Sequence, residues 1–150
     1  MTLLLDTSAL IGLSERLNPA VIALLTEVGD EDVHVSAISF GELGAGVRRA
    51  VIQGLDPALV ERRRATVSDA RSLVPIDIDD AVVECYEIVA SLAARRVGQN
   101  DQWIIASAMT HGHDLVTEDV EQATLMNSDR IQSTLRASGF PTATARFVAA

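Results

Sequence analysis

The sequence contains no lysine, and all twelve of its basic residues are arginine. Sites that need a lysine are therefore excluded, among them the P-loop that cradles phosphates, the Schiff base, and the phosphoacceptor receiver domains whose site includes one. The single cysteine, Cys85, cannot form an internal disulfide. The N-terminus lacks a basic segment followed by an apolar one, and no apolar run approaches the roughly 20 residues that cross a bilayer. We therefore expect a cytoplasmic protein with no membrane span.

Positive charge is also scarce, since the formal net charge is −9 and the pI is about 4.6. An acidic balance of this size usually argues against a nucleic-acid partner, because phosphate binding relies on clustered cations. The arginines nevertheless fall into three groups, at residues 48–49, 62–64 and 95–96. These groups form either local basic patches or solvated helix faces, and the sequence leaves both interpretations open.

Short apolar runs alternate with longer helical patterns along the whole chain, and no repeat or linker interrupts them. Strands are expected at residues 3–5, 33–36, 74–76, 115–117 and 145–148. Helices are expected at residues 9–16, 19–28, 39–53, 57–73, 79–96, 101–111 and 120–137. The alternation predicts right-handed crossovers and a parallel sheet covered on both faces. The expected fold is one α/β domain at residues 1–150, a three-layer α/β/α sandwich around four to five parallel strands.

Acidic residues stand where these strands end or where the next helices begin. Asp6 ends the first strand, and Glu42 lies in the first helical turn after the second strand. Asp101 starts a helix, and Asp119 follows the fourth strand. Ligands of open parallel sheets bind outside the carboxyl ends of the strands, where the strand order reverses. The positions therefore predict that these carboxylates meet at one edge of the sheet.

Each of these acids has a second interpretation as a helix cap. Asp6, Asp101 and Asp119 could each accept a backbone N–H at a helix start, and Ser39-x-x-Glu42 has the form of a capping box. Caps alone do not explain why the acids should share one edge with few cations beside them. Clustered carboxylates repel one another unless a cation joins them, and a set of oxygen ligands suits Mg²⁺ or Mn²⁺ better than zinc. Such an ion activates water for attack on a phosphodiester and neutralises an acidic cleft.

The stretches LLLDTSALI, ISFGELGAGV and NDQWIIASAMTHGHDLVTED, in this order, resemble the PIN-domain ribonucleases. In compact form they are similar to the VapC toxins of bacterial toxin–antitoxin pairs, over about residues 3–123. The resemblance implies a Mg²⁺- or Mn²⁺-dependent endoribonuclease that cuts structured RNA, tRNA or rRNA, and so inhibits translation. It also implies a cognate VapB-type antitoxin as inhibitor and a homodimer.

Matching positions carry the roles of the family's acidic site onto this chain. The resemblance implies that Asp6, Glu42, Asp101 and Asp119 form the catalytic site. Asp6 and Asp101 would hold the principal metal, while Glu42 and Asp119 would orient waters or complete the ligand shell.

Hydroxyl side chains and one further acid supplement this set. Thr7 and Ser8 would help to fix a carboxylate, a water or the phosphate. Many relatives have an Asp followed by Phe shortly after the fourth acid, where this chain has Glu121-Gln122-Ala123. Glu121 is a candidate substitute, and one or two metals remain open. The segment from about Met126 onward is less familiar, and its strand is placed by pattern alone.

Two further motifs do not support other enzyme classes. Gly41-x-x-Gly44-x-Gly46 lacks the order of a dinucleotide-binding loop, and close packing of another backbone is its expected use. Ser8 stands where a haloacid-dehalogenase-type phosphatase needs a second aspartate, and that class also needs a lysine. Neither motif changes the assignment.

Several single residues are expected to have ordinary structural roles. His111 and His113 have no third metal ligand nearby and are expected at a helix end. Cys85 lies on the apolar face of its helix and is expected in the core. Trp103 could stack on an RNA base, but packing beside a buried helix is the favoured interpretation.

The main alternative to an enzyme is a non-catalytic PIN-like module that binds RNA or protein. Such a module has no need of a self-repelling set of acids, so the intact set favours catalysis. A homodimer is compatible with an apolar surface expected on the first two helices, at Leu10, Ile11, Leu13, Leu24 and Leu25.

Overall fold

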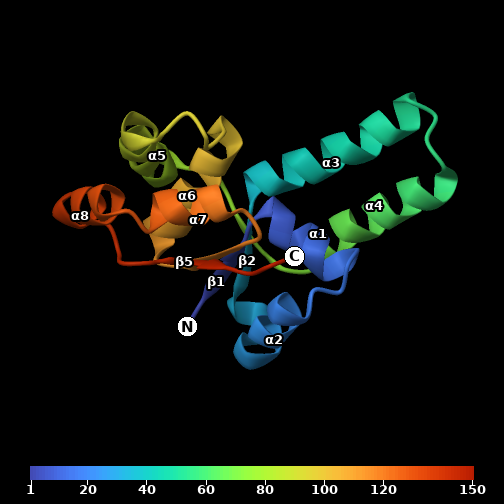
Figure 1. Ribbon diagram of the computed structural model, residues 1–150, viewed down its shortest axis with the longest axis horizontal. Helices are drawn as coiled ribbons and strands as arrows, with labels where there is room; N and C mark the ends of the chain where they lie inside the picture. The colour runs from blue at the N-terminus through green and yellow to red at the C-terminus, as the bar shows by residue number, and fades with distance from the viewer.

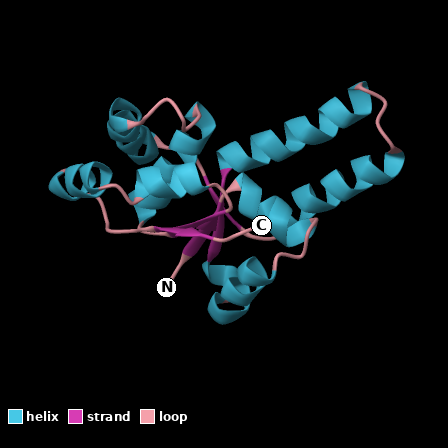
Figure 2. Ribbon diagram, viewed as in Figure 1, coloured by secondary structure: helices cyan, strands magenta, loops and turns pink.

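The computed structural model describes residues 1–150. Five strands form one parallel sheet in the order β3-β2-β1-β4-β5, with helices on both of its faces (Figures 1 and 2). The strands are β1 (Leu3–Leu5), β2 (Val33–Ser36), β3 (Val74–Ile76), β4 (Asp114–Thr117) and β5 (Ala145–Phe147). The helices are α1 (Thr7–Ser14), α2 (Pro19–Val28), α3 (Ala37–Ile52), α4 (Pro57–Arg71), α5 (Asp80–Leu92), α6 (Gln99–His111), α7 (Val120–Met126) and α8 (Asp129–Ala137), with a short 3-10 helix η1 at Asp30–Asp32. The predicted α/β/α sandwich is confirmed.

The sheet is wound in two directions from its central strand, β1. The chain passes from β1 to β2 and β3 on one side, and then crosses to β4 and β5 on the other. Leu5 at the end of β1 pairs with Val35 of β2 and with Val116 of β4, both in parallel. The strand order therefore reverses between β1 and β4, and a ligand site is expected outside the carboxyl ends of these two strands.

Successive leucines of β1 enter two separate cores. Leu4 packs with residues of α5, α6, α7 and α8, whereas Leu3 and Leu5 pack with residues of α1, α2, α3 and α4. All three leucines are fully buried. Burying one leucine side chain stabilises the fold by about 1.5–3 kcal/mol relative to leaving it exposed. Because β1 is covered on both faces, its backbone is held in place. The strand therefore fixes the position of Asp6, the residue that follows it. Cys85 lies in the first core, as predicted.

Helices α3 and α4 form an arm that extends from the sheet and folds back (Figure 1). Leu43 near the base of the arm is 7% exposed, whereas Ile52 near its tip is 82% exposed. Six of the twelve arginines but only three of the 21 acids lie at residues 43–72. The arm therefore carries net positive charge in an acidic protein.

The first helix of the arm, α3, begins earlier than predicted. Ser36 caps α3, because its hydroxyl accepts a hydrogen bond from the Ile38 backbone N–H at 3.2 Å. The expected capping box of Ser39 and Glu42 is therefore wrong, since both residues lie inside the helix. Glu42 is left free for another role.

The predicted helix at residues 120–137 is two helices, α7 and α8. Between them, the Asn127 side chain donates to the Ala145 carbonyl at 3.0 Å and accepts from the Ala145 N–H at 2.8 Å. Ser128 then caps α8 through the backbone N–H of Ile131. The break ties this part of the chain to β5. Helix α5 also ends at Leu92, before the predicted 96.

No single helix is long and apolar enough to cross a bilayer; only α1 and α2 taken together have such a length and composition, and they bend by 99° at their junction.

Histidine side chains stack at the end of the sheet opposite Asp6. The ring of His113, just before β4, stacks on His34 of β2 with centroids 3.9 Å apart. Its Nδ1 lies 2.7 Å from Thr2 Oγ1, and the residue is only 9% exposed. His111 at the end of α6 lies further off, with ring centroids 5.8 Å apart. His113 is thus a packed residue.

Acid is expected to destabilise the protein through His113. Burial, followed by the nearby His34 and His111, lowers the pKa of His113 to about 4. The unfolded chain takes up this proton near pH 6.5, so stability falls as the pH drops from about 6.5 to about 4. We expect a loss of about 2 kcal/mol, which allows for partial solvent access of the ring. Denaturant unfolding at pH 7 and pH 4.5 measures it, and His113→Phe should lack this part of the loss. An equal loss of stability between pH 7 and pH 4.5 in the wild type and in His113→Phe would show that His113 does not cause it.

Candidate functional site

Asp6 lies directly after β1 and is held by three hydrogen bonds. Its Oδ1 accepts from the Ala9 backbone N–H at 2.8 Å and from Ser8 Oγ at 2.7 Å. Its Oδ2 accepts from Thr117 Oγ1, at the end of β4, at 2.5 Å. Asp6 is only 3% exposed. It therefore caps α1 and also lies at the point where the strand order reverses.

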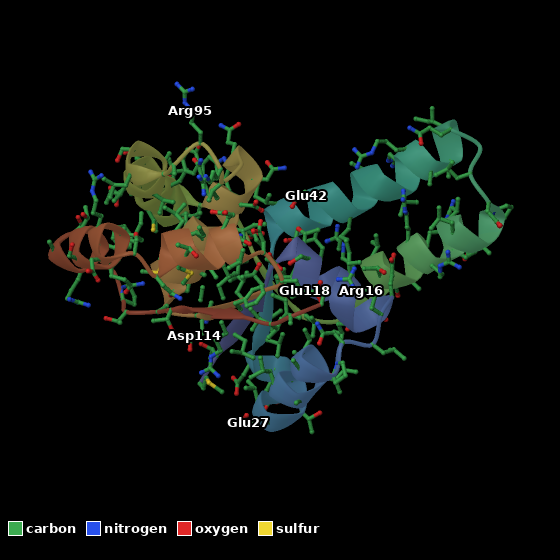
Figure 3. The ribbon with its side chains drawn as sticks, in the orientation of Figure 1. Arg16, Glu27, Glu42, Arg95, Asp114 and Glu118 are labelled. Atoms are coloured by element: carbon green, nitrogen blue, oxygen red, sulfur yellow. The ribbon has the colours of Figure 1, made fainter.

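Glu42 reaches the same edge from the base of the arm (Figure 3). Thr7 Oγ1 donates to Glu42 Oε1 at 2.6 Å and lies 3.1 Å from Ser39 Oγ. Thr7 thus fixes Glu42 against the start of α1. Of the two hydroxyls predicted to support the site, Thr7 contacts Glu42 and Ser8 contacts Asp6.

Asp101 and Asp119 come from the starts of two other helices. Asp101 lies in the first turn of α6, whose N-cap is Gly98, so its interpretation as a cap is wrong. Asp119 does cap α7, because its side chain accepts from the backbone N–H groups of Glu121 and Gln122.

Electrostatics show that the four acids share one environment. Burial raises the pKa of Asp101 to about 6, and the charges of Asp119, Asp6 and Glu42 add to the rise in that order. Burial also raises the pKa of Asp6 to about 6, with a small contribution from Asp119, although three hydrogen bonds oppose the rise. The structure therefore brings the predicted carboxylates together.

No arginine neutralises this set. The ion pairs of the protein are Arg16 with Glu118, Arg64 with Glu61, Arg96 with Glu121, and Arg146 with Asp114. None of these pairs includes any of the four clustered acids. No ion pair within the chain therefore neutralises these four carboxylates, and a cation from solution would relieve their repulsion.

The donor chemistry fits a hard divalent cation. The ligands on offer are carboxylate and hydroxyl oxygens, which suit Mg²⁺ and Mn²⁺. As the side chains stand, no three His, Cys, Asp or Glu groups are close enough to enclose one metal ion. Mg²⁺ does not require such a cage, because it keeps several waters and is usually held by one or two carboxylates. Asp6 and Asp101, the two acids with raised pKa values, are the residues that would hold it.

Glu121 differs from the clustered acids. It lies in the first turn of α7, and its carboxylate is 3.7 Å from the guanidinium of Arg96. Its side chain is 45% exposed. Because an arginine already faces Glu121, it does not contribute an unpaired charge as Asp101 does.

Two polar residues behind the acids were missed from the sequence. Thr117 Oγ1 contacts Asp6, accepts from the Asp119 backbone N–H at 2.9 Å, and lies 3.0 Å from Gln122 Oε1. Gln122 is fully buried, and its Nε2 donates to the Asp101 carbonyl at 3.3 Å. A hydroxyl at the end of an apolar strand was the available signal for Thr117. For Gln122 no local signal existed, because only the packing of α7 on α6 buries it.

The glycines of α3 do not have the use expected from their spacing. A Cβ added at Gly41, Gly44 or Gly46 would meet nothing within 4 Å, so close backbone packing is not their purpose. Trp103 does pack, as predicted, with its ring stacked on Tyr86 at a centroid distance of 3.6 Å.

A pocket of about 450 Å³ extends along the arm, from Glu42 at its base to Leu55 near its tip. Thr7 and Glu42 line it on the side of the acids, and Arg49 and Arg63 also line it, from α3 and α4. Arg63 is held by donating to the Gly46 carbonyl at 2.9 Å, whereas Arg49 is exposed. One arginine from each of two groups noted in the sequence therefore lines the same pocket as Glu42.

Comparison with known proteins identifies relatives of this arrangement. The PIN domain family matches residues 3–125. Ribonuclease VapC4 of Mycobacterium tuberculosis is 34% identical over 126 residues, which cover 81% of this chain and 89% of that protein. Among solved structures, VapBC-5 of Mycobacterium tuberculosis, a member of the VapBC family of toxin–antitoxin systems, has a TM-score of 0.68 at 22% identity and covers 98% of both chains. FitAcB of Neisseria gonorrhoeae has a TM-score of 0.61 at 28% identity, over 84% of this chain and 94% of its own.

Proposed function

The chain belongs to the PIN-domain family, among its VapC ribonucleases, and we propose that it is a Mg²⁺- or Mn²⁺-dependent endoribonuclease. In this proposal it is the toxin of a type II toxin–antitoxin pair and cleaves structured RNA, tRNA or rRNA, so that translation stops. The observation that carries the proposal is the set of four clustered acids without any arginine partner.

The site residues divide into those that would hold the ion and those that would orient the reactants. A bound divalent ion would supply a Lewis acid for the phosphodiester and for water. Asp6 and Asp101 would hold it, and Asp6 is already fixed by hydrogen bonds. Glu42, oriented by Thr7, and Asp119, fixed at the start of α7, would accept hydrogen bonds from water beside the scissile phosphate.

The direct test is cleavage of a structured RNA by purified protein freed of any antitoxin. We expect cleavage with Mg²⁺ or Mn²⁺, none with EDTA, and recovery when the ion is restored in excess. Mapping the 5′ ends of the products would identify the RNA and the cut site. Cleavage that continues unchanged in EDTA, or no cleavage of any structured RNA with either ion, would reject the proposal.

The arm supplies the positive charge that an RNA substrate needs. Lys and Arg contacts to phosphates dominate nucleic-acid affinity and make it depend on salt. We expect Arg49→Gln to weaken RNA binding and to reduce the slope of log K against log salt by about one. Binding is measured with the Asp101→Asn variant, so that RNA stays intact. Arg136→Gln, an exposed arginine on α8, is the control, and equal effects of the two substitutions would contradict a role for the pocket.

A cognate VapB-type antitoxin and a homodimer are part of the proposal. Solved relatives include VapBC complexes, and copurification with the product of an adjacent small gene would test the antitoxin. Of the apolar residues expected at the surface of α1 and α2, Leu10 is buried and the others are partly buried around the same core. The exposed large apolar residues include Leu17 and Ile22 in this region, and Val51, Ile52 and Leu55 at the tip of the arm.

A further inference from the structure

Glu118 is a buried carboxylate that the acidic site does not use. Its side chain is only 5% exposed and is paired with Arg16. Its Oε2 also accepts a hydrogen bond from Asn18 Nδ2 at 2.8 Å, and its backbone N–H donates to Ser8 Oγ at 2.9 Å. Figure 3 shows Glu118 and Arg16 together beside α1. Glu118 is therefore fastened to α1 and the turn after it at both its backbone and its carboxylate.

The sequence of α1 prepares a surface for this side chain. Ser8 and Gly12 are four residues apart in α1, which places them on one side of the helix. Arg16 follows shortly after the helix ends. A Cβ added at Gly12 would overlap Oε2 of Glu118 and lie 2.9 Å from its Cδ. Leu17 has a left-handed backbone, with φ of 49°. This turn separates Arg16 from Asn18 and lets both reach the same carboxylate.

Glu118 is costly to keep in this position. Desolvating an ion pair can outweigh its attraction, and an apolar residue of similar size is often neutral or stabilising in its place. The cost is higher in a chain with a net charge of −9, and the left-handed Leu17 adds strain. Stability alone is therefore a poor reason for this arrangement.

What the arrangement does fix is the segment between β4 and α7. Glu118 is the residue before Asp119, and the hydroxyl of Ser8 that receives its backbone N–H also donates to Asp6. Asp119 is otherwise held by its own N–H bond to Thr117 and by its capping of α7. Glu118 thus also anchors this segment to α1, the helix that Asp6 caps.

We infer that Glu118, clamped by Arg16 and Asn18 over Gly12, is a positioning residue that sets the place of Asp119 relative to Asp6. The inference rests on the proposed function, because it assigns Glu118 a part in that reaction. Glu118 touches neither the ion nor the RNA; it acts through the segment that carries Asp119.

A pair of substitutions tests the clamp from both sides. Glu118→Ala removes the carboxylate, and Gly12→Ala pushes the carboxylate away without removing any polar group. Each single variant is expected to lower kcat at saturating RNA and the affinity for Mn²⁺ by about 10–100-fold, the range for residues that support metal ligands. KM for RNA should stay within about threefold, because the arginines of the arm are untouched. Mn²⁺ affinity is measured calorimetrically without RNA.

The double variant gives the sharpest outcome. With Glu118→Ala already present, the Cβ of Gly12→Ala meets no carboxylate, so the double variant should be no worse than Glu118→Ala alone. Glu118→Gln keeps an acceptor for Asn18 and should recover part of kcat. Glu27→Gln on α2, far from the acidic edge (Figure 3), should match the wild type.

Other results would overturn the inference. Variants that unfold at lower temperature but keep wild-type kcat and Mn²⁺ affinity while folded would show a purely structural role. If the fold-losses in kcat and Mn²⁺ affinity of the two single variants multiply in the double variant, Gly12 acts independently of Glu118. If the wild type binds Mn²⁺ but cleaves no RNA, the proposed function fails. The Mn²⁺ affinities of the wild type and of the Glu118 and Gly12 variants would still test the positioning role of Glu118. A wild type that does neither overturns both.

Discussion

Asp101→Asn is expected to lose about three orders of magnitude in RNA cleavage while the folded protein becomes more stable at pH 7.5. Losing several kcal/mol of transition-state stabilisation from a metal site gives a rate effect of this size. The gain in stability follows from the raised pKa of Asp101, about 6, which burial and the neighbouring Asp119, Asp6 and Glu42 produce. Above that pKa the ionised carboxylate opposes folding, and the substitution removes the charge without changing the shape. We expect a gain of about 1 kcal/mol, since solvent reaches part of the side chain.

Asp101 separates the two effects better than Asp6 does. No hydrogen bond stabilises the charged form of Asp101, whereas Asp6 accepts three. Rates are compared at saturating RNA, and stability by denaturant unfolding in EDTA. Glu27→Gln removes one exposed charge on α2 and should change neither quantity. A variant of Asp101 that cleaves at the wild-type rate would show that this acid does not hold the ion.

Mg²⁺ or Mn²⁺ should raise the melting temperature of the wild type by about 5–10 °C at a hundredfold excess over Kd. Binding to the folded state alone contributes about 2.7 kcal/mol at that concentration, and each kcal/mol moves Tm by about 2–4 °C in a protein of this size. The same ion should shift Asp101→Asn much less, and EDTA should reverse the shift. Equal shifts in the wild type and in Asp101→Asn would place the ion elsewhere.

The pH dependence of the ion-free protein has a definite sign. The pKa values of Asp6 and Asp101 are raised from 3.8 to about 6 in the folded state. The contribution of these two carboxyl groups to folding stability is therefore fully present below about pH 3.8, and it is lost as the pH rises through about 6. The titration of His113 runs the opposite way over an overlapping range. The His113→Phe protein should therefore show the carboxylate effect alone, and a bound divalent ion should remove it.

Helix capping illustrates how far local sequence could be interpreted. At Asp6 and Asp119 the cap and the candidate site residue are the same side chain, since each accepts a backbone N–H at a helix start and lies at the acidic edge. At Glu42 the capping box was wrong, because Ser36 begins α3 one turn earlier. A formal motif could not distinguish these cases, because Ser36 and Ser39 both offer a suitable hydroxyl.

The break between α7 and α8 shows a different limit. Ser128 with Asp129 was a local signal for a new helix start, and it lay within a pattern that reads as continuous. What ends α7 is the pairing of Asn127 with the backbone of Ala145. That contact exists only because β5 lies beside β4 in the sheet, which no local pattern reveals.

By itself the sequence determined the strands, most of the helices, the layered fold and the candidate acids, because these depend on periodicity and on neighbours along the chain. Only the tertiary structure decided which polar groups from distant parts of the chain support those acids. Thr117 and Asp6 are 111 positions apart, and Glu118 and Arg16 are 102 apart. Such pairs meet because β4 lies beside β1, and strand order is set by the packing of two whole cores rather than by any short stretch. The raised pKa values have the same origin, since burial produces them and burial belongs to the assembled fold.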